Sequence, residues 1–259
     1  MRISFIGAGR VAHHLARVLS QHHQIMQIYS RSFEPAHTLA AQVGATAAAN
    51  ISEINPEIDL VIIAVSDQAI ASVIVDVHQH LPDALLVHTS GSTDIEVLAK
   101  THARAGVLYP LQTFSLDREI TWVDTPLFVE AKFENDLVLL NELANQLSSR
   151  VYQYTSAQRL SLHLAAVFAC NFSNYCYDMA KQVVDAQQVD FSLLYPLILE
   201  TAHKAVQHDP KQMQTGPAMR GDRNILKMHE HMLQDAQRED LKSIYNLMSQ
   251  QIMQSHRSE

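Results

Sequence analysis

Cysteine, glycine and positive charge are all scarce in this sequence of 259 residues. Two cysteines, Cys170 and Cys176, are too few for a disulfide framework, and their spacing on a helix would point them apart, so we expect reduced thiols. Nineteen basic against 27 acidic residues give a formal charge of −8, which argues against nucleic acid as the main partner. No apolar run approaches the roughly 20 residues of a membrane span, and the N-terminus lacks a signal peptide's apolar stretch. We expect a soluble, cytoplasmic protein.

Short β-rich runs alternate with helical patterns through the first 155 residues, which is typical of parallel strands joined by crossover helices. The unbroken apolar run Leu60–Val65 indicates a strand buried on both faces. Beyond residue 155 the patterns are helical. We predict an α/β fold, with a Rossmann-like, doubly wound, mostly parallel sheet over residues 1–155 and an all-α domain over residues 156–259. The predicted strands lie near 3–6, 24–29, 45–49, 60–65, 84–88, 107–109, 127–130 and 151–154.

A glycine-rich turn directly follows the first predicted strand and opens a helix. It has the form G-x-G-x-x-A: the first glycine permits the tight turn, the second lets backbone approach a pyrophosphate, and the small third residue lets helix and strand pack closely. Free N–H groups at the helix N-terminus would bind the phosphates. The turn therefore predicts a dinucleotide site, although the glycines could serve the turn alone. The candidate cofactor-binding residues are Gly7, Ala8, Gly9, Arg10, Val11 and Ala12.

The end of the second predicted strand distinguishes between the two nicotinamide cofactors. NAD enzymes usually carry a carboxylate there for the ribose 2′-hydroxyl, whereas this chain has Ser30, Arg31 and Ser32. A guanidinium flanked by hydroxyls suits a 2′-phosphate, because arginine makes two charge-assisted bonds to it. We expect NADP, as NADPH, to be preferred. The alternative is that Arg31 is a solvated loop residue.

Polar residues also follow the next predicted strands. Ligands in open α/β sheets sit beyond the carboxyl ends of the strands, so these residues would line the cofactor and substrate cleft. Taken singly, each of them is more often a turn or cap residue. We assign Val65, Ser66, Thr89 and Ser90 to the cofactor, His88 to proton transfer and Gln112 to the substrate.

The helix expected from Ser156 carries polar side chains among mostly apolar ones. At about 100° per residue, His163, Asn171, Asn174 and Asp178 fall within an arc of roughly 80°. Polar groups on a buried helix need partners, because each unpaired one costs about 1–3 kcal/mol. The arc indicates a site in which His163 moves a proton while Asn171 and Asn174 bind substrate. Alternatively, these groups bond neighbouring helix ends or a dimer partner.

A turn near residues 215–222 is a second candidate. Arg220 could bind an acidic group of the substrate, and His229, two helical turns later, could transfer a proton. The alternative is a plain turn, a helix cap at Asp222 and a surface histidine. Metal ligands on one helix are spaced about three or four residues apart, and no pair of histidines has that spacing. His229 and His231, for example, diverge by about 200°. We expect no metal.

The order of these motifs resembles a bacterial family that joins a Rossmann-like domain to a helical domain of unknown function. The matching segments are 5–12, 88–92, 110–114, 163–169 with Asn171, and 216–222 with His229, which span nearly the whole chain. More distantly, the family resembles pyrroline-5-carboxylate reductases, deazaflavin-linked NADP oxidoreductases and the 6-phosphogluconate dehydrogenase group. The resemblance implies an NADP-linked oxidoreductase whose helical domain closes the active site and often forms a homodimer.

Three departures limit what the resemblance implies about substrate. Related chains tend to carry histidine where this one has Tyr109. Hydroxyacid dehydrogenases of the wider group place a lysine four residues before an asparagine, but here Val167 precedes Asn171 and Cys170 precedes Asn174. The Ser/Thr-and-glycine signature of proline-forming reductases is also missing. The missing lysine argues against a 3-hydroxyacid or 6-phosphogluconate reaction, and the resemblance does not identify the substrate.

The sequence therefore favours an NADP-dependent oxidoreductase, either a reductase or the reverse dehydrogenase, that acts on a small polar imine, ketone or alcohol. Histidine suits the proton transfer because its pKa lies near neutral pH. The candidates are, in order, His163, His229 and His88. The alternative hypothesis is a non-catalytic NADP-binding sensor or partner protein that retains the fold.

Overall fold

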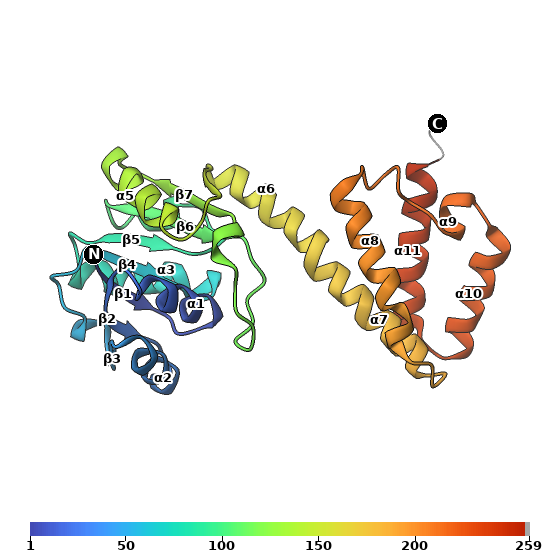
Figure 1. Ribbon diagram of the computed structural model, residues 1–259, viewed down its shortest axis with the longest axis horizontal. Coiled ribbons are helices and arrows are strands. Elements are labelled where there is room, and N and C mark those ends of the chain that lie inside the picture. Colours follow the sequence, from blue (N-terminus) through green and yellow to red (C-terminus); the bar gives the residue numbers. More distant parts are fainter. Residues whose placement is uncertain (257–259) are drawn as a thin grey trace. The chain divides into compact units, whose positions relative to one another are not determined.

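The computed structural model describes residues 1–256, and its N-terminal part is built on a sheet with strand order β3-β2-β1-β4-β5-β6-β7-β8 (Figure 1). Neighbouring strands are parallel except for β6 and β7, which pair antiparallel. This confirms the predicted doubly wound, mostly parallel sheet. The strands are β1 (Arg2–Ile6), β2 (Gln24–Tyr29), β3 (Thr46–Ala48), β4 (Leu60–Ile63), β5 (Leu85–His88), β6 (Ala105–Pro110), β7 (Leu127–Ala131) and β8 (Val151–Gln153).

Helices cover both faces of the sheet, and each face has its own core. One core contains apolar residues of α1 (Arg10–Leu19), α2 (Phe33–Val43) and α5 (Glu134–Asn145). The other contains residues of α3 (Asp67–His80) and α4 (Glu96–Ala99). All four residues of β4 are buried, as its unbroken apolar sequence predicts. Short 3₁₀ turns lie at Ile51–Glu53 and Trp122–Asp124.

The chain divides into two compact units, one from Met1 to Ala169 and one that begins at Cys170. This division lies beyond the boundary that we expect after residue 155, and that boundary stays a prediction. The first unit contains α6 (Ser156–Ala166), whose Thr155 cap and Gln158 form a capping box.

The described part of the second unit is helical, as predicted. Among residues 170–256, only Ala218 and Leu241 are buried apolar residues. Cys170 is exposed, and both cysteines are free thiols. The helices of the second unit are α7 (Ser173–Asp185), α8 (Tyr195–Gln207), α9 (Pro217–Arg220), α10 (Arg223–Asp235) and α11 (Glu239–Ser255), with a 3₁₀ turn at Phe191–Leu194.

A π-helical segment, Val167–Phe172, interrupts the regular α-helix that we expected after residue 156. Its i→i+5 winding turns less per residue than an α-helix, so the uniform 100° per residue behind the arc of four polar residues does not hold across this segment, and the arc stays a prediction. Asn171, Asn174 and Asp178 are exposed in the single chain, and therefore they need no buried partner. The turn expected near residues 215–222 contains the short helix α9.

Candidate active site

The glycine turn has the backbone geometry that its sequence predicts. Gly7 has a φ of +110°, and a Cβ there would lie 2.3 Å from the carbonyl oxygen of Ala64. Its N–H donates to the carbonyl of Tyr29 at 2.7 Å, which ties the turn to the end of β2. Gly9 is the N-cap of α1, and the first turn of that helix carries no acidic residue. The helix N-terminus therefore presents free N–H groups without a competing carboxylate.

A cavity of about 440 Å³ lies beside this turn. The ends of β1, β2 and β4 form it together with α3, so it occupies the position expected for a dinucleotide in this fold. Predicted cofactor residues that line it are Gly7, Ala8, Gly9, Ser30, Arg31, Ser32, Val65 and Ser66. Arg10, Val11 and Ala12 begin α1, where Ala12 is buried in the core, and Thr89 and Ser90 lie beyond β5.

The electrostatics of the cavity suit a phosphorylated ribose. Arg31 is exposed at its edge between Ser30 and Ser32, so its guanidinium is free to turn toward a ligand. Among the described residues that line the cavity, none is an aspartate or glutamate. A 2′-phosphate would therefore meet a cation and hydroxyls, and no carboxylate would repel it.

The cavity is linked to the loop after β5 by a hydrogen bond between Asp67 and Ser92. Asp67 begins α3 directly after the cavity residue Ser66, and its carboxylate accepts from the Ser92 hydroxyl. The Ser90 hydroxyl oxygen accepts from the N–H groups of Ser92 and Thr93, at 3.1 and 2.9 Å. The loop from His88 to Thr93 is therefore closed on itself and attached to the wall of the cavity.

Tyr109 and His163 contact each other beside Gly91 of this loop. The Tyr109 hydroxyl lies 3.3 Å from Nδ1 of His163, and the two rings are arranged edge to face. Gly91 lies between them, because a Cβ on Gly91 would come within 2.6 Å of both side chains. Tyr109 is buried and His163 is half-buried. A titratable imidazole thus lies next to the carboxyl ends of β5 and β6, all within the first unit.

His88, at the end of β5, is fully buried. Its Nδ1 accepts from the Ser90 N–H at 3.2 Å, so the neutral ring carries its proton on Nε2. Burial, reinforced by the charge of Arg159, lowers the pKa of His88 to about 3. The ring therefore stays neutral at physiological pH, where it can donate a hydrogen bond but holds no extra proton to transfer.

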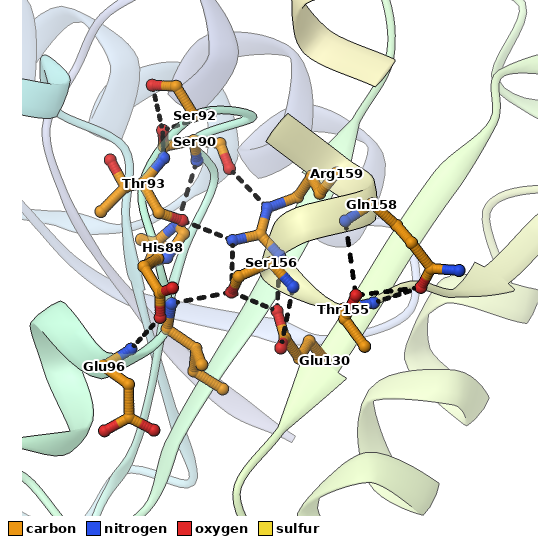
Figure 2. Close-up of polar contacts among 12 residues, drawn as sticks. His88, Ser90, Ser92, Thr93, Glu96, Glu130, Thr155, Ser156, Gln158 and Arg159 are labelled. Atoms are coloured by element: carbon orange, nitrogen blue, oxygen red, sulfur yellow. Dashed lines mark hydrogen bonds and ion pairs between the residues drawn. The ribbon is translucent and has the colours of Figure 1, made fainter. Parts of the chain in front are cut away.

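Arg159 organises the base of the site (Figure 2). Its side chain is 1% exposed and forms an ion pair of 2.6 Å with Glu130 of β7. Its guanidinium also donates to the carbonyl of Ser90 at 3.2 Å and to the carbonyl of Thr93. Ser156 donates to the same Glu130 carboxylate at 2.8 Å. These bonds fix the first turn of α6 against the loop that holds His88 and Gly91.

The remaining candidates belong to other environments. Gln112 is exposed in the loop after β6, where its side-chain oxygen accepts from the N–H of Thr113. Asn171, Asn174, Arg220 and His229 belong to the second unit, and their place in the site stays a prediction. There His229 Nδ1 lies 2.9 Å from the Tyr245 hydroxyl, and Arg220 is exposed at the end of α9. Asp222 caps α10, as we expected.

Sequence reasoning missed several residues of the site. Tyr29, Ala69, Ser72 and Val73 also line the cavity, and the small side chains of Ala69 and Ser72, three positions apart on α3, could have indicated a close ligand. Arg159 lies four positions before His163, on the same side of α6, and could have been included in the polar pattern of that helix.

Comparison with known families and structures gives two family matches. The family described as "NADP oxidoreductase coenzyme F420-dependent" matches residues 2–91, and the domain of unknown function DUF2520 matches residues 125–252. None of the curated proteins matches the chain.

Solved structures extend the similarity over the whole chain. A Bacteroides fragilis protein provisionally assigned as an NADP oxidoreductase is 40% identical, with 98% of each chain covered and a TM-score of 0.91. The imine reductase from Myxococcus stipitatus in complex with NADP⁺ is 14% identical, with 100% and 95% covered and a TM-score of 0.74. The 1-pyrroline-5-carboxylate reductase from Streptococcus pyogenes is 12% identical, with 100% and 99% covered and a TM-score of 0.60.

The imine reductase and the pyrroline-5-carboxylate reductase have low identities to this chain, so these two matches show a shared fold alone. The 40% identity to the Bacteroides protein covers both units and shows a shared family. No helix among residues 1–256 is long and apolar enough to cross a membrane. The chain belongs to the NADP oxidoreductase family in which a Rossmann-type nucleotide-binding domain is followed by DUF2520.

Proposed function

We propose that the chain is an NADPH-dependent oxidoreductase that transfers hydride between nicotinamide and a small polar imine, ketone or alcohol. The observation that carries the proposal is a chain of contacts within the first unit. It runs from the cavity at Gly7 and Arg31, through the Asp67–Ser92 hydrogen bond, to the imidazole of His163 beside Gly91. Proteins with this fold include an imine reductase and a pyrroline-5-carboxylate reductase, and we extend that chemistry to this chain as part of the proposal.

The residues of the site divide into three roles. The glycine turn and the N-terminus of α1 bind the pyrophosphate, and Arg31 with its flanking serines binds the 2′-phosphate. NADPH supplies the hydride. His163 carries the proton, because His88 is held neutral by its burial. Gln112, Asn171 and Asn174 orient the substrate, Arg220 binds an acidic group on it, and His229 is the second candidate for proton transfer.

The cofactor preference is tested by fluorescence titration of the wild-type protein with NADPH and, separately, with NADH. We expect binding of NADPH at least about tenfold tighter, because the Arg31 guanidinium bonds the 2′-phosphate. Arg31→Asp should abolish that preference, because a carboxylate repels the phosphate and accepts from a 2′-hydroxyl.

Arg17→Asp is the matched control, since it makes the same charge change elsewhere in the first unit, on α1 outside the residues that line the cavity. It should leave the NADPH preference intact. An unchanged preference in Arg31→Asp would remove Arg31 from the site. Binding of neither cofactor by the wild type would contradict both the oxidoreductase and the NADP-binding sensor.

We also propose that the chain forms a homodimer through its helical unit. With so few buried apolar residues, the described part of this unit lacks the core that a domain of its size needs. On α8, which buries no residue, Leu197, Leu199 and Val206 are 63%, 58% and 82% exposed, and Leu197 lies on the side opposite Leu199. A helix that is apolar on opposite sides is normally buried. Association of two copies would cover these side chains.

Light scattering coupled to size exclusion tests the dimer. The wild type should have twice the 29.1 kDa mass of one chain. The double variant Leu199→Glu/Val206→Glu should shift the mass to that of a monomer, because it places two charges in the apolar interface. Gln207→Glu, which adds a charge to the same turn of α8 without removing an apolar side chain, is the control and should stay dimeric. A monomeric wild type would contradict the proposal.

A further inference from the structure

The contact between Tyr109 and His163 joins two elements that are distant in sequence. Tyr109 is near the end of β6 and His163 is near the end of α6, yet the hydroxyl oxygen lies 3.3 Å from Nδ1 of the imidazole. Gly91 closes the space around this contact, because any Cβ there would overlap both rings. The contact is therefore held by the backbone of the loop after β5 as well as by the two side chains.

We propose that Tyr109 is the positioning residue of His163: its hydroxyl occupies Nδ1, so that Nε2 is the nitrogen that exchanges a proton with the substrate. This inference rests on the proposed oxidoreductase function, and it adds a residue that the sequence marked only as a departure from related chains. Tyr109 itself need not touch the substrate.

A hydroxyl is suited to this position because it can both donate and accept. When His163 is neutral with its proton on Nε2, the Tyr109 hydroxyl donates to Nδ1. When His163 is an imidazolium, Nδ1–H donates to the Tyr109 oxygen. The pairing at Nδ1 therefore persists in both protonation states, and the orientation of the ring need not change during the reaction.

The proton balance follows from this arrangement. In the reductive direction the substrate carbon gains a hydride, and its nitrogen or oxygen accepts the Nε2 proton of the imidazolium. The substrate is reduced by two electrons, and NADPH is oxidised to NADP⁺. His163 is left neutral with its proton on Nδ1, bonded to the Tyr109 oxygen. Because His163 is half-buried and not enclosed, Nε2 can regain its proton from water.

The surroundings of Tyr109 keep its hydroxyl in place and protonated. Tyr109 is 9% exposed, and its ring packs against Phe128 with the ring centres 6.1 Å apart. Burial raises the pKa of Tyr109 above its usual value, an effect that the positive charge of Arg159 opposes and the negative charge of Asp67 supports. The hydroxyl therefore remains both a donor and an acceptor at neutral pH.

Ring-nitrogen NMR of ¹⁵N-histidine-labelled protein tests the pairing without any turnover. His163→Gln identifies the two His163 signals by their loss. In Tyr109→Phe, which keeps the buried ring, we expect the Nδ1 signal of His163 to move to the position of an unbonded nitrogen. An Nδ1 signal that does not respond to Tyr109→Phe would overturn the proposal.

The chain offers a matched control in a second tyrosine–histidine contact, between Tyr245 and His229. Tyr245→Phe should move the Nδ1 signal of His229 and leave the signals of His163 unchanged. A response of His163 to Tyr245→Phe would show that the signals report general loosening, and would overturn the assignment of a specific bond.

A kinetic measurement then separates positioning from packing. With the cyclic imine 2-methyl-1-pyrroline as probe, Tyr109→Phe should lower kcat at least about tenfold and leave the NADPH Kd within about twofold of wild type. Tyr152→Phe, which loses a hydroxyl from another ring packed on Phe128, should keep its kcat. Loss of kcat without a change at Nδ1 would place Tyr109 on the substrate and overturn the positioning role. A wild type that does not reduce the imine contradicts the substrate class alone, because the NMR result still decides the role of Tyr109.

Discussion

Replacing Arg159 with methionine is expected to lower the free energy of unfolding by about 3–5 kcal/mol, the cost of removing one partner from a buried ion pair. Methionine retains most of the side-chain length, so lost volume contributes little. What remains is the Glu130 carboxylate, 19% exposed, without its cation, and the carbonyls of Ser90 and Thr93 without their donor. Each buried group left unpaired adds to the cost.

Urea unfolding followed by tryptophan fluorescence measures this loss in the relevant part of the chain. Trp122 is the only tryptophan, and it packs against the core of the first unit. Adding Glu130→Leu to Arg159→Met should recover part of the stability, because the double variant leaves no unpaired charge. A larger loss in the double variant than in the single one would contradict the unpaired-carboxylate explanation.

Lys132→Met is the matched control for burial. Lys132 and Glu96 also form an ion pair of 2.6 Å, but their side chains are 41% and 49% exposed. Water screens such a pair, so its removal should change stability little. If both variants lost the same stability, burial would not be the cause, and the network around Arg159 would have no special part in holding the loop from His88 to Thr93.

The sheet domain could be predicted from local sequence because its signals are local. The apolar run of β4 and the glycine turn after β1 each specify their structure within about ten residues, through burial on two faces and through backbone conformation. The residues that line the cavity follow from the same logic, since the carboxyl ends of neighbouring parallel strands meet. Gly7, Arg31 and Ser66 were therefore found without any knowledge of distant contacts.

The base of the site could not be predicted in this way. Arg159 resembles a surface arginine until Glu130, in a distant strand, is placed beside it. Likewise, only the folded chain brings Tyr109 to His163. The π-helical segment at Val167–Phe172 was missed for a different reason: helical periodicity assumes a constant turn per residue, and the sequence of this segment carries no signal that the winding changes.

Replacing Gly7 with alanine is expected to have the second large effect, the loss of both stability and NADPH binding. Its φ of +110° is strained for any residue with a Cβ, and that Cβ would lie 2.3 Å from the Ala64 carbonyl oxygen at the end of β4. The turn must move away from β4, at a cost of roughly 3 kcal/mol or more. Because the turn carries the N-terminus of α1 with it, we expect NADPH affinity to fall at least about tenfold.

Gly9→Ala separates the shape of the turn from contact with the cofactor. Gly9 has a φ of −81°, and no atom lies within 4 Å of a Cβ placed there, so the protein should unfold at the same urea concentration as wild type. The new methyl group would nevertheless occupy the space through which a pyrophosphate approaches the backbone, and NADPH affinity should fall at least about tenfold. Wild-type affinity in Gly9→Ala would show that the phosphates bind elsewhere, and that Gly7 serves only the turn.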